Sequence, residues 1–393
     1  MISCLECSFT GHVLFDHLVE KHGMDSQKYL AKHPGAETVS AEALAAWEKR
    51  TTVKRTAAPD ASNLKTTLMG VEVSVDAGIP ESQCLPNPKG YRLPTTGSAK
   101  GKTERALWTL IDGGRVFIHG PPGTGKDALV HHYSATTRRP AMILTFRPGT
   151  DLSPWFYRRS LRAEDNGYVY GSLWKAITEG VMGRDGKRRP VLVLLSDVDR
   201  ADPAQAEWFR MLTDSICGRV LGPDGEMVDL FPGTQFVFTA NSCGTGDSRG
   251  RMISANAMDA SIMDRLGAKV EFTYLAWSDE VCTLREKYPL IAEKAADVFT
   301  QLEKATAALR QAIVKETIYA EFTHRSLCDI LDEAVRRMKF TKKVEPNLLA
   351  KAFNAWFDGL DETNRREAKV LVDAFLTGGA LGKGKNGSLD GDD

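Results

Sequence analysis

Residues 120–127 read Gly120-Pro121-Pro122-Gly123-Thr124-Gly125-Lys126-Asp127, after the apolar run 116–118 and before a helix-compatible segment, 128–134. This is the setting of a phosphate-binding loop. Glycines let the backbone approach a phosphate chain, the next helix presents free N–H groups, and Lys126 reaches the outer phosphates. We therefore predict that the loop and Ala128 bind a nucleotide. Such loops end in Lys and then Ser or Thr, whose hydroxyl ligates Mg²⁺, and here Asp127 takes that place.

The apolar runs around the loop predict the fold class. Further runs occupy residues 141–146, 191–195, 236–240 and 269–272, separated by helix-compatible stretches. Strands that alternate with helices predict an α/β fold with a five-stranded parallel sheet between helices. The run 191–195 is apolar throughout, which indicates a strand buried on both faces. Two insertions interrupt the pattern, at 148–170 and at 218–228, and the second is predicted to be a hairpin.

The rest of the chain divides into further segments. We predict a zinc-finger-like module at 1–33, a helix (40–49) and linker within 34–63, and an α/β core with an irregular lead-in at 64–277. A helical lid follows at 278–376, and a Gly-, Lys- and Asp-rich disordered tail at 377–393. The helices expected in these parts lie at 104–112, 298–314, 324–338, 346–360 and 365–376.

Composition excludes some classes of partner. The 51 Lys plus Arg balance 51 Asp plus Glu, so the chain has no overall charge that would favour nucleic acid or an anionic membrane. No apolar run is long enough to span a bilayer and the N-terminus does not resemble a signal peptide, so we expect a cytoplasmic protein without a membrane partner. Outside one Cys-x-x-Cys pair the cysteines are scattered, which predicts reduced, mostly buried thiols.

The N-terminal residues carry a metal-binding pattern. Cys4, Cys7, His17 and His22 have the spacing C-x2-C-x9-H-x4-H, which is typical of a tetrahedral Zn²⁺ site. His12 lies outside this set. The stretch resembles the single zinc finger of the Ros/MucR type, whose members bind DNA. However, three lysines against four acidic residues match phosphate poorly, so a finger that docks on protein is at least as well supported.

A second motif follows the third apolar run. Residues 196–203 resemble the Asp-Glu-x-Asp-Arg-Ala block of AAA+ ATPases, in which Asp holds a water of magnesium and Glu activates the attacking water. In the register that aligns Arg200 and Ala201, Ser196 replaces the Asp and Asp197 replaces the Glu. The other register makes Asp197 the magnesium-side Asp and leaves Val198 at the position of the base. We prefer the first register.

This register suggests that two residues have exchanged places. The resemblance puts a hydroxyl on the loop and a carboxylate on the strand, whereas this chain has Asp127 on the loop and Ser196 on the strand. Our hypothesis is that Asp127 ligates Mg²⁺ and Ser196 bonds one of its waters. The alternative is two simple losses, with weak nucleotide binding or binding without hydrolysis.

Three more residues occupy positions that the AAA+ resemblance marks as catalytic. Asn241 ends the fourth apolar run, as the sensor-1 residue does, although it would also suit a turn. Arg265 precedes the fifth strand, as an arginine finger does, or makes a surface ion pair. Arg325 opens a helix at the sensor-2 position, or is an ordinary arginine in a first helical turn. With Asp197 they complete the predicted catalytic set.

The order of these motifs over residues 70–340 resembles MoxR-type AAA+ ATPases, and within them the CobS subunit of aerobic cobaltochelatase. The lead-in residues Ile79-Pro80 and Leu85-Pro86-Asn87-Pro88 are similar too. The resemblance implies ATP and Mg²⁺ as cofactors, a homo-oligomeric ring, usually a hexamer, and a partner protein with a von Willebrand A-type domain. The departures at Asp127, Ser196 and Asp197, with the N-terminal finger, indicate a divergent relative.

Three functions fit the sequence. The first is an ATP-hydrolysing AAA+ ring that remodels or activates a partner protein. The second is a nucleotide-gated assembly module with little hydrolysis, which the altered metal-side residues favour. The third is an ATPase directed to DNA by the finger, which the net charge disfavours.

Overall fold

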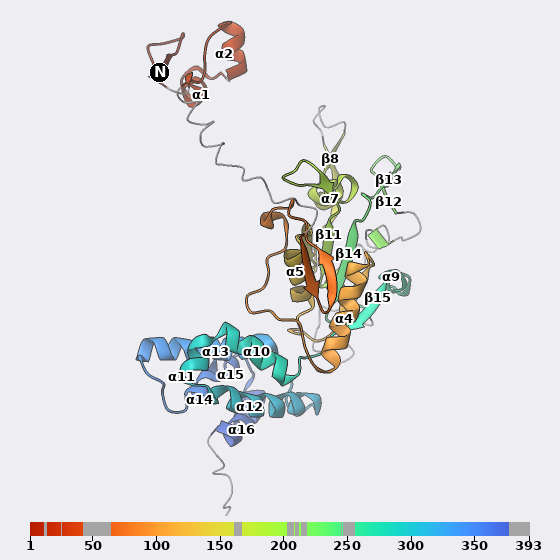
Figure 1. The fold of residues 1–393 in the computed structure, drawn as a ribbon, viewed down its shortest axis with the longest axis vertical. Helices are drawn as coiled ribbons and strands as arrows, with labels where there is room; N and C mark the ends of the chain where they lie inside the picture. The colour runs from red at the N-terminus through yellow and green to blue at the C-terminus, as the bar shows by residue number, and fades with distance from the viewer. Residues whose placement is uncertain are drawn as a thin grey trace, which may run out of the picture. The chain divides into compact units, whose positions relative to one another are not determined.

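The computed structural model describes residues 1–11, 14–24, 26–41, 64–160, 167–202, 208, 212–213, 218–244, 246 and 256–376. It divides into two compact units, Met1–Ala61 and Ser62–Asp393 (Figure 1). Most of the helix expected at 40–49, the linker and the tail at 377–393 lie outside the described residues. The domain boundaries drawn from the sequence therefore stay predictions.

The first unit is built on a very small core. Strands β1 (Ile2–Ser3) and β2 (Thr10–Gly11) pair antiparallel, and helices α1 (Phe15–His22) and α2 (Ser26–Lys32) follow. Cys4, Leu14, Leu18 and Tyr29 are buried together, and the Leu5 N–H donates a hydrogen bond of 2.8 Å to the Tyr29 hydroxyl. A core of this size rarely stabilises a fold without a metal or a crosslink.

The second unit contains the predicted five-stranded parallel sheet, which is confirmed. Its strands are β5 (Val116–His119), β6 (Ala141–Thr145), β11 (Leu192–Ser196), β14 (Gln235–Ala240) and β15 (Ala268–Glu271). They lie in the order β15-β5-β14-β11-β6, and every neighbouring pair is parallel. The carboxyl ends of all five strands therefore meet at one edge of the sheet.

Both faces of the sheet are covered, as the apolar run in β11 predicts. Leu192 and Leu194 pack on the face covered by α4 (Gly97–Ile111) and α5 (Lys126–Thr137). Val193 and Leu195 pack on the other face, against α7 (Ser172–Glu179) and α9 (Ala260–Arg265). Successive side chains of a strand point to opposite faces, so each strand residue meets a core and none needs to be polar.

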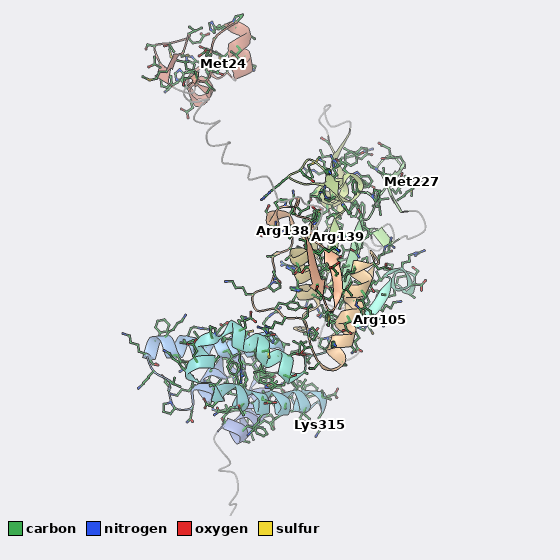
Figure 2. The ribbon with its side chains drawn as sticks, viewed as in Figure 1. Met24, Arg105, Arg138, Arg139, Met227 and Lys315 are labelled. Carbon is green, nitrogen blue, oxygen red and sulfur yellow. The ribbon has the colours of Figure 1, made fainter. Side chains whose placement is uncertain are left out.

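The lead-in and the insertions are more regular than expected. The lead-in begins with a hairpin of β3 (Lys65–Leu68) and β4 (Val71–Ser74). The prediction that the lead-in is irregular was therefore wrong for this segment. The hairpin predicted at 218–228 is confirmed as β12 (Arg219–Leu221) and β13 (Met227–Asp229), whose first residue is labelled in Figure 2. The insertion at 148–170 contains α6 (Ser153–Phe156), β7 (Tyr157–Arg159) and β8 (Tyr168–Tyr170). Short elements η1 (Glu81–Gln83), β9 (Val181–Met182), β10 (Arg188–Arg189) and η3 (Val198–Arg200) complete this part.

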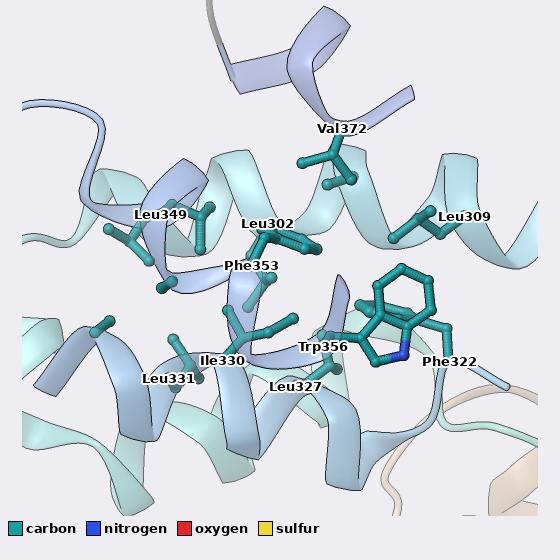
Figure 3. Close-up of a cluster of buried hydrophobic side chains, with 14 of the residues drawn as sticks. Leu302, Leu309, Phe322, Leu327, Ile330, Leu331, Leu349, Phe353, Trp356 and Val372 are labelled. Atoms are coloured by element: carbon teal, nitrogen blue, oxygen red, sulfur yellow. The ribbon is translucent and has the colours of Figure 1, made fainter. Parts of the chain in front are cut away.

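The C-terminal part of the second unit is helical. It comprises α10 (Trp277–Lys287), α11 (Pro289–Lys294), α12 (Asp297–Val314), α13 (His324–Thr341), α14 (Leu348–Ala352), α15 (Asn354–Phe357) and α16 (Glu362–Leu376). The helix predicted at 346–360 is thus two short helices. Leu302, Phe322, Ile330 and Phe353 lie at the centre of its core (Figure 3). Thr323 caps α13, and its hydroxyl accepts from the N–H groups of Arg325 and Ser326.

Two further sequence expectations can be compared with the described residues. Among these, no helix is both long and apolar enough to cross a membrane. Cys217 lies outside the described residues. Of the four scattered cysteines that the structure describes, only Cys328 is buried, Cys84 is half-buried, and Cys243 and Cys282 are exposed, so for these four the expectation of mostly buried thiols was wrong.

The central strand gives a direct test of the fold. Leu194 is fully buried in β11, paired between β6 and β14. We expect Leu194→Ala to lower the free energy of unfolding by about 2–5 kcal/mol, because it leaves a cavity where the sheet meets its helices. Urea denaturation measures this loss. The matched control is Leu64→Ala, whose side chain is 45% exposed, and an equal loss in both variants would contradict the assigned core.

Candidate functional site

The phosphate-binding loop connects β5 to α5 and needs glycine at particular positions. Gly120 has φ of +140°, and a Cβ there would lie 2.1 Å from the carbonyl oxygen of Phe272. Gly125, with φ of +84°, is the N-cap of α5. A Cβ on Gly123 would lie 2.7 Å from that of Thr323, the residue that caps α13. The loop is therefore packed closely between the end of the sheet and the C-terminal helices.

Lys126 lies across the loop and links it to β14. Its ammonium group donates to the carbonyl oxygens of Gly120 at 2.8 Å and Pro121 at 3.0 Å, and to Asn241 Oδ1 at 3.0 Å. Burial lowers the pKa of Lys126, and the nearby Asp127 carboxylate opposes this shift. Thr124 Oγ1 donates to the same Pro121 carbonyl at 2.9 Å, and Pro122 lies in the same turn. These contacts hold a buried cation over the place where phosphates bind in such loops.

Asp127, the unusual residue of the loop, has two hydroxyl partners on the sheet. Ser196 Oγ donates to Asp127 Oδ2 and Thr239 Oγ1 donates to Asp127 Oδ1, each at 2.6 Å. Ser196 ends β11 and Thr239 lies next to the end of β14, and their exposed fractions are 2% and 1%. The sequence pairing of Asp127 with Ser196 is thus a direct contact. Thr239 was missed, although its place one residue from a strand end was a usable signal.

Asp197 and Asn241 meet beside this carboxylate. Asn241 Nδ2 donates to Asp197 Oδ1 at 3.1 Å, so the amide of Asn241 connects Lys126 with Asp197. Burial raises the pKa of Asp197, and the carboxylates of Asp127 and Asp199 add to the shift while Arg200 and Lys126 oppose it. Asp197 has φ of +56°, in the left-handed region where a non-glycine residue is strained.

Asp199 is a second residue that the sequence reading missed. Its Oδ2 accepts from the N–H groups of Asn241 at 3.0 Å and Ser242 at 2.9 Å, and from the Ser242 hydroxyl at 3.0 Å. Asp199 is 1% exposed, and no described residue bonds its Oδ1. Its acceptor bonds fix the chain just beyond β14 and so position the Asn241 side chain.

A cavity of about 190 Å³ opens on the loop at Gly125 and Ala128. Its wall includes Tyr91 from the lead-in, Phe272 and Tyr274 after β15, and His324 at the start of α13. An apolar cavity beside a phosphate loop suits a flat nucleobase. The lead-in, for which the sequence predicted no site residue, therefore contributes Tyr91 to the candidate site.

The C-terminal helices are tied to the core around this cavity. Asp279 in α10 accepts hydrogen bonds from the N–H and hydroxyl groups of both Thr95 and Thr96, at 2.5–3.1 Å. Buried Glu280 forms ion pairs with Arg310, at 2.8 and 3.0 Å, and with His324 at 3.1 Å. Charged pairs with this many bonds fix geometry more than they add stability.

The two predicted arginines lie at the margins of the site. Arg325 follows His324 and is exposed, and its charge contributes to the lowered pKa of Lys126, after burial. Arg265 is exposed at the end of α9, and its guanidinium contacts the Ser261 carbonyl at 3.3 Å. Among the described residues Arg265 makes no hydrogen bond or ion pair with the loop, so within one chain it is not part of the cluster.

The first unit brings its four predicted ligands together. The donor atoms of Cys4, Cys7, His17 and His22 all lie within 4.8 Å of one another. Cys7 Sγ lies 3.2 Å from His17 Nε2, and Cys4 Sγ lies 3.6 Å from His22 Nε2. Two thiolates and two imidazoles at this spacing match a tetrahedral metal site, and no other described group of His, Cys, Asp and Glu does so.

One known protein family matches the region that holds the loop. Residues 115–266 match the family described as AAA domain (dynein-related subfamily). This region is therefore similar to AAA domains. A search of curated proteins found no match.

Solved structures similar to the chain include RuvB from Thermotoga maritima. The RuvB Holliday junction branch migration motor is 13% identical, covers 71% of this chain and 77% of that chain, and has a TM-score of 0.41. A point mutant of the same protein is 15% identical, with 72% and 78% covered and a TM-score of 0.43.

The α/β part of the second unit thus brings most of the predicted site residues into one place. The loop, Ser196, Asp197 and Asn241 form two hydrogen-bonded groups that meet at the adjacent residues Lys126 and Asp127, and Arg325 lies near them. The roles assigned to these residues stay predictions.

His324 predicts how stability depends on pH. Burial opposes charging of its ring, but hydrogen bonds to Cys328 and Glu280 outweigh burial and raise its pKa to about 9 from 6.5. Because the folded state holds this proton more tightly, the stabilisation is complete below pH 6.5 and is lost as pH rises through about 9. Thermal unfolding across that range should show this decline in the wild type and a flatter profile in His324→Gln. The control is His131→Gln, which removes a histidine bonded to the Pro86 carbonyl, and a wild-type-like decline in His324→Gln would contradict the assignment.

Proposed function

We propose that the protein is an ATP-hydrolysing ring motor that remodels or activates a partner protein. One observation supports this most: two hydrogen-bonded groups, Lys126–Asn241–Asp197 and Asp127–Ser196, meet at adjacent loop residues beside the carboxyl ends of β5, β11 and β14. In open parallel sheets this edge is where ligands bind. Phosphoryl transfer needs a cation that binds the phosphates, oxygen ligands that hold a metal ion, and a polar pair that orients the attacking water.

The oxygen ligands of this group fit Mg²⁺. A carboxylate is a hard ligand that Mg²⁺ prefers, and Asp127 with Ser196 would hold it. A divalent cation held by these residues would neutralise charge on a bound triphosphate. The Ser196–Asp127 contact supports the sequence register that puts Ser196 at the magnesium side and Asp197 at the water side. The exchange of hydroxyl and carboxylate between loop and strand is part of this proposal.

The remaining groups would act on the attacking water and the γ-phosphate. Asp197 and Asn241 are joined at 3.1 Å, and we propose that this pair orients the water. Arg325 would contact the γ-phosphate of its own chain. Arg265, which is exposed and outside the cluster, would act on the site of a neighbouring subunit in a hexameric ring.

The partner is proposed from the resemblance of the sequence to MoxR-type and CobS-type ATPases. By that resemblance, the ring acts on a protein with a von Willebrand A-type domain, and metal insertion is one such setting.

A nucleotide-gated assembly module with little hydrolysis is the second candidate. The observation in its favour is that both Asp127 oxygens already accept a hydroxyl, which can reflect a structural role instead of metal binding. Steady-state phosphate release separates the two candidates.

We propose that the first unit is a zinc-bound module that docks on protein. Its four donors fit Zn²⁺. Lys32 and His33 bind Glu6, and their hydrogen bonds lower its pKa to about 2, so an acidic group lies beside these cations and weakens their attraction for phosphates. Retention of the full chain on duplex DNA at physiological salt would support the DNA-directed alternative instead.

The exchange hypothesis makes a prediction about three variants. We expect Asp127→Thr and Ser196→Asp each to slow ATP hydrolysis by about 10- to 100-fold, because each leaves a mismatched pair around the metal. The double variant should recover much of this loss, since it restores the usual arrangement. Phosphate release measures the rates, with Lys126→Ala as background and Asp112→Thr, an exposed site, as control. If the double variant hydrolyses ATP no faster than the single variants, the exchange is refuted. If the wild-type rate equals that of Lys126→Ala, the assembly module is favoured.

The four Cys and His donors of the first unit predict a specific metal content. The purified chain should carry one equivalent of zinc, measured by elemental analysis, in a Cys2His2 site. Cys7→Ser and His17→Gln should lose it and make the first unit sensitive to protease. His12→Gln, which removes a histidine outside the set, should keep it. Equal zinc in all four proteins would show that these residues do not bind the metal.

A further inference from the structure

The charge at the loop differs from that of a loop with a hydroxyl at its end. Lys126 and Asp127 are adjacent, so the loop carries no net positive charge. The charged groups that face Lys126 are Asp127, Asp197, Asp199 and Arg325. Three carboxylates therefore surround two cations at the place where a polyanion must bind.

We propose that Asp127, held by the hydroxyls of Ser196 and Thr239, makes the site selective for the metal complex of a nucleoside triphosphate over the free nucleotide. Thr239 is then a positioning residue for Asp127. This inference rests on the nucleotide binding proposed above and adds which form of the nucleotide is bound.

The hydroxyls prevent the carboxylate from turning away. Leu195 pairs with Phe238 in the parallel register of β11 and β14, so Ser196 and Thr239 are adjacent and share the face covered by α5. Each hydroxyl holds a different oxygen of Asp127 at 2.6 Å. Since each carboxylate oxygen has two lone pairs, each retains an acceptor position for a cation or its water.

A fixed carboxylate acts in opposite directions on the two forms of the nucleotide. Like charges about 4 Å apart repel strongly in a partly buried site, whereas a divalent cation between them makes both contacts attractive. In a loop that ends with a hydroxyl, the repulsion of the metal-free nucleotide is missing because that side chain has no charge. The selectivity therefore follows from the carboxylate and from the two bonds that keep it in place.

Calorimetric titration of the full chain with a non-hydrolysable ATP analogue tests this, in Mg²⁺ and in EDTA. We expect at least about tenfold tighter binding with Mg²⁺, equivalent to about 1.4 kcal/mol. Asp127→Asn should shrink the ratio, chiefly by strengthening binding in EDTA. Thr239→Val should also shrink it and Thr239→Ser should restore it. Asp112→Asn, which removes an exposed carboxylate elsewhere, should leave the ratio unchanged.

A second measurement checks the coupling without hydrolysis. Mn²⁺ binding, followed by electron paramagnetic resonance, must strengthen on addition of the analogue by the same factor by which Mn²⁺ strengthens binding of the analogue. Equal affinity in Mg²⁺ and EDTA, or an unchanged ratio in Asp127→Asn, would overturn the inference. Absence of binding under both conditions would instead refute the proposed nucleotide site. If Thr239→Val does not fold, the ratio of affinities in Mg²⁺ and EDTA for Asp127→Asn still tests the inference.

Discussion

The parallel pairing of β14 with its two neighbours is the constraint on which the candidate site depends. Its register with β5 pairs Ala240 with His119, the last residues of the two strands. Asn241 and Gly120 are therefore the first residues beyond the sheet. Its register with β11 places Thr239 next to Ser196. Because the loop follows β5 without an intervening residue, α5 brings Lys126 and Asp127 over these strand ends. A one-residue slip in either pairing would turn the hydroxyls to the opposite face.

The hydrogen bonds around this edge form two linked groups with different charge. Lys126, Asn241 and Asp197 form one chain of bonds, in which the Asn241 amide accepts from the cation and donates to the carboxylate. Asp127 with Ser196 and Thr239 forms the other. Asp199 positions the first group because its carboxylate accepts hydrogen bonds from the backbone N–H groups of Asn241 and Ser242. A buried network with nearly all members bonded has a single arrangement, which suits a site that must be in place before its ligand binds.

The C-terminal helices complete the site and are bound to the core through polar contacts. Asp279 bonds Thr95 and Thr96 of the lead-in, and Thr323 packs against Gly123 of the loop. Their own core, centred on Phe322 and Phe353, is separate from the two cores of the sheet. These helices therefore have a core of their own and meet the α/β part at the polar contacts named above.

The sequence determined the sheet, the loop and the grouping of four Cys and His donors in the first unit, because each depends on local pattern. Apolar runs identify strands, glycines and a lysine in fixed spacing identify the loop, and the Cys/His spacing identifies the donors. Spacing cannot reveal partners that are far apart in the chain. Thr239 is 112 residues from Asp127, and Asp199 holds Asn241 from 42 residues away. The tertiary structure alone decided that the loop carboxylate would be held by two hydroxyls, because strand order and register, which no local pattern encodes, bring those strand ends under α5.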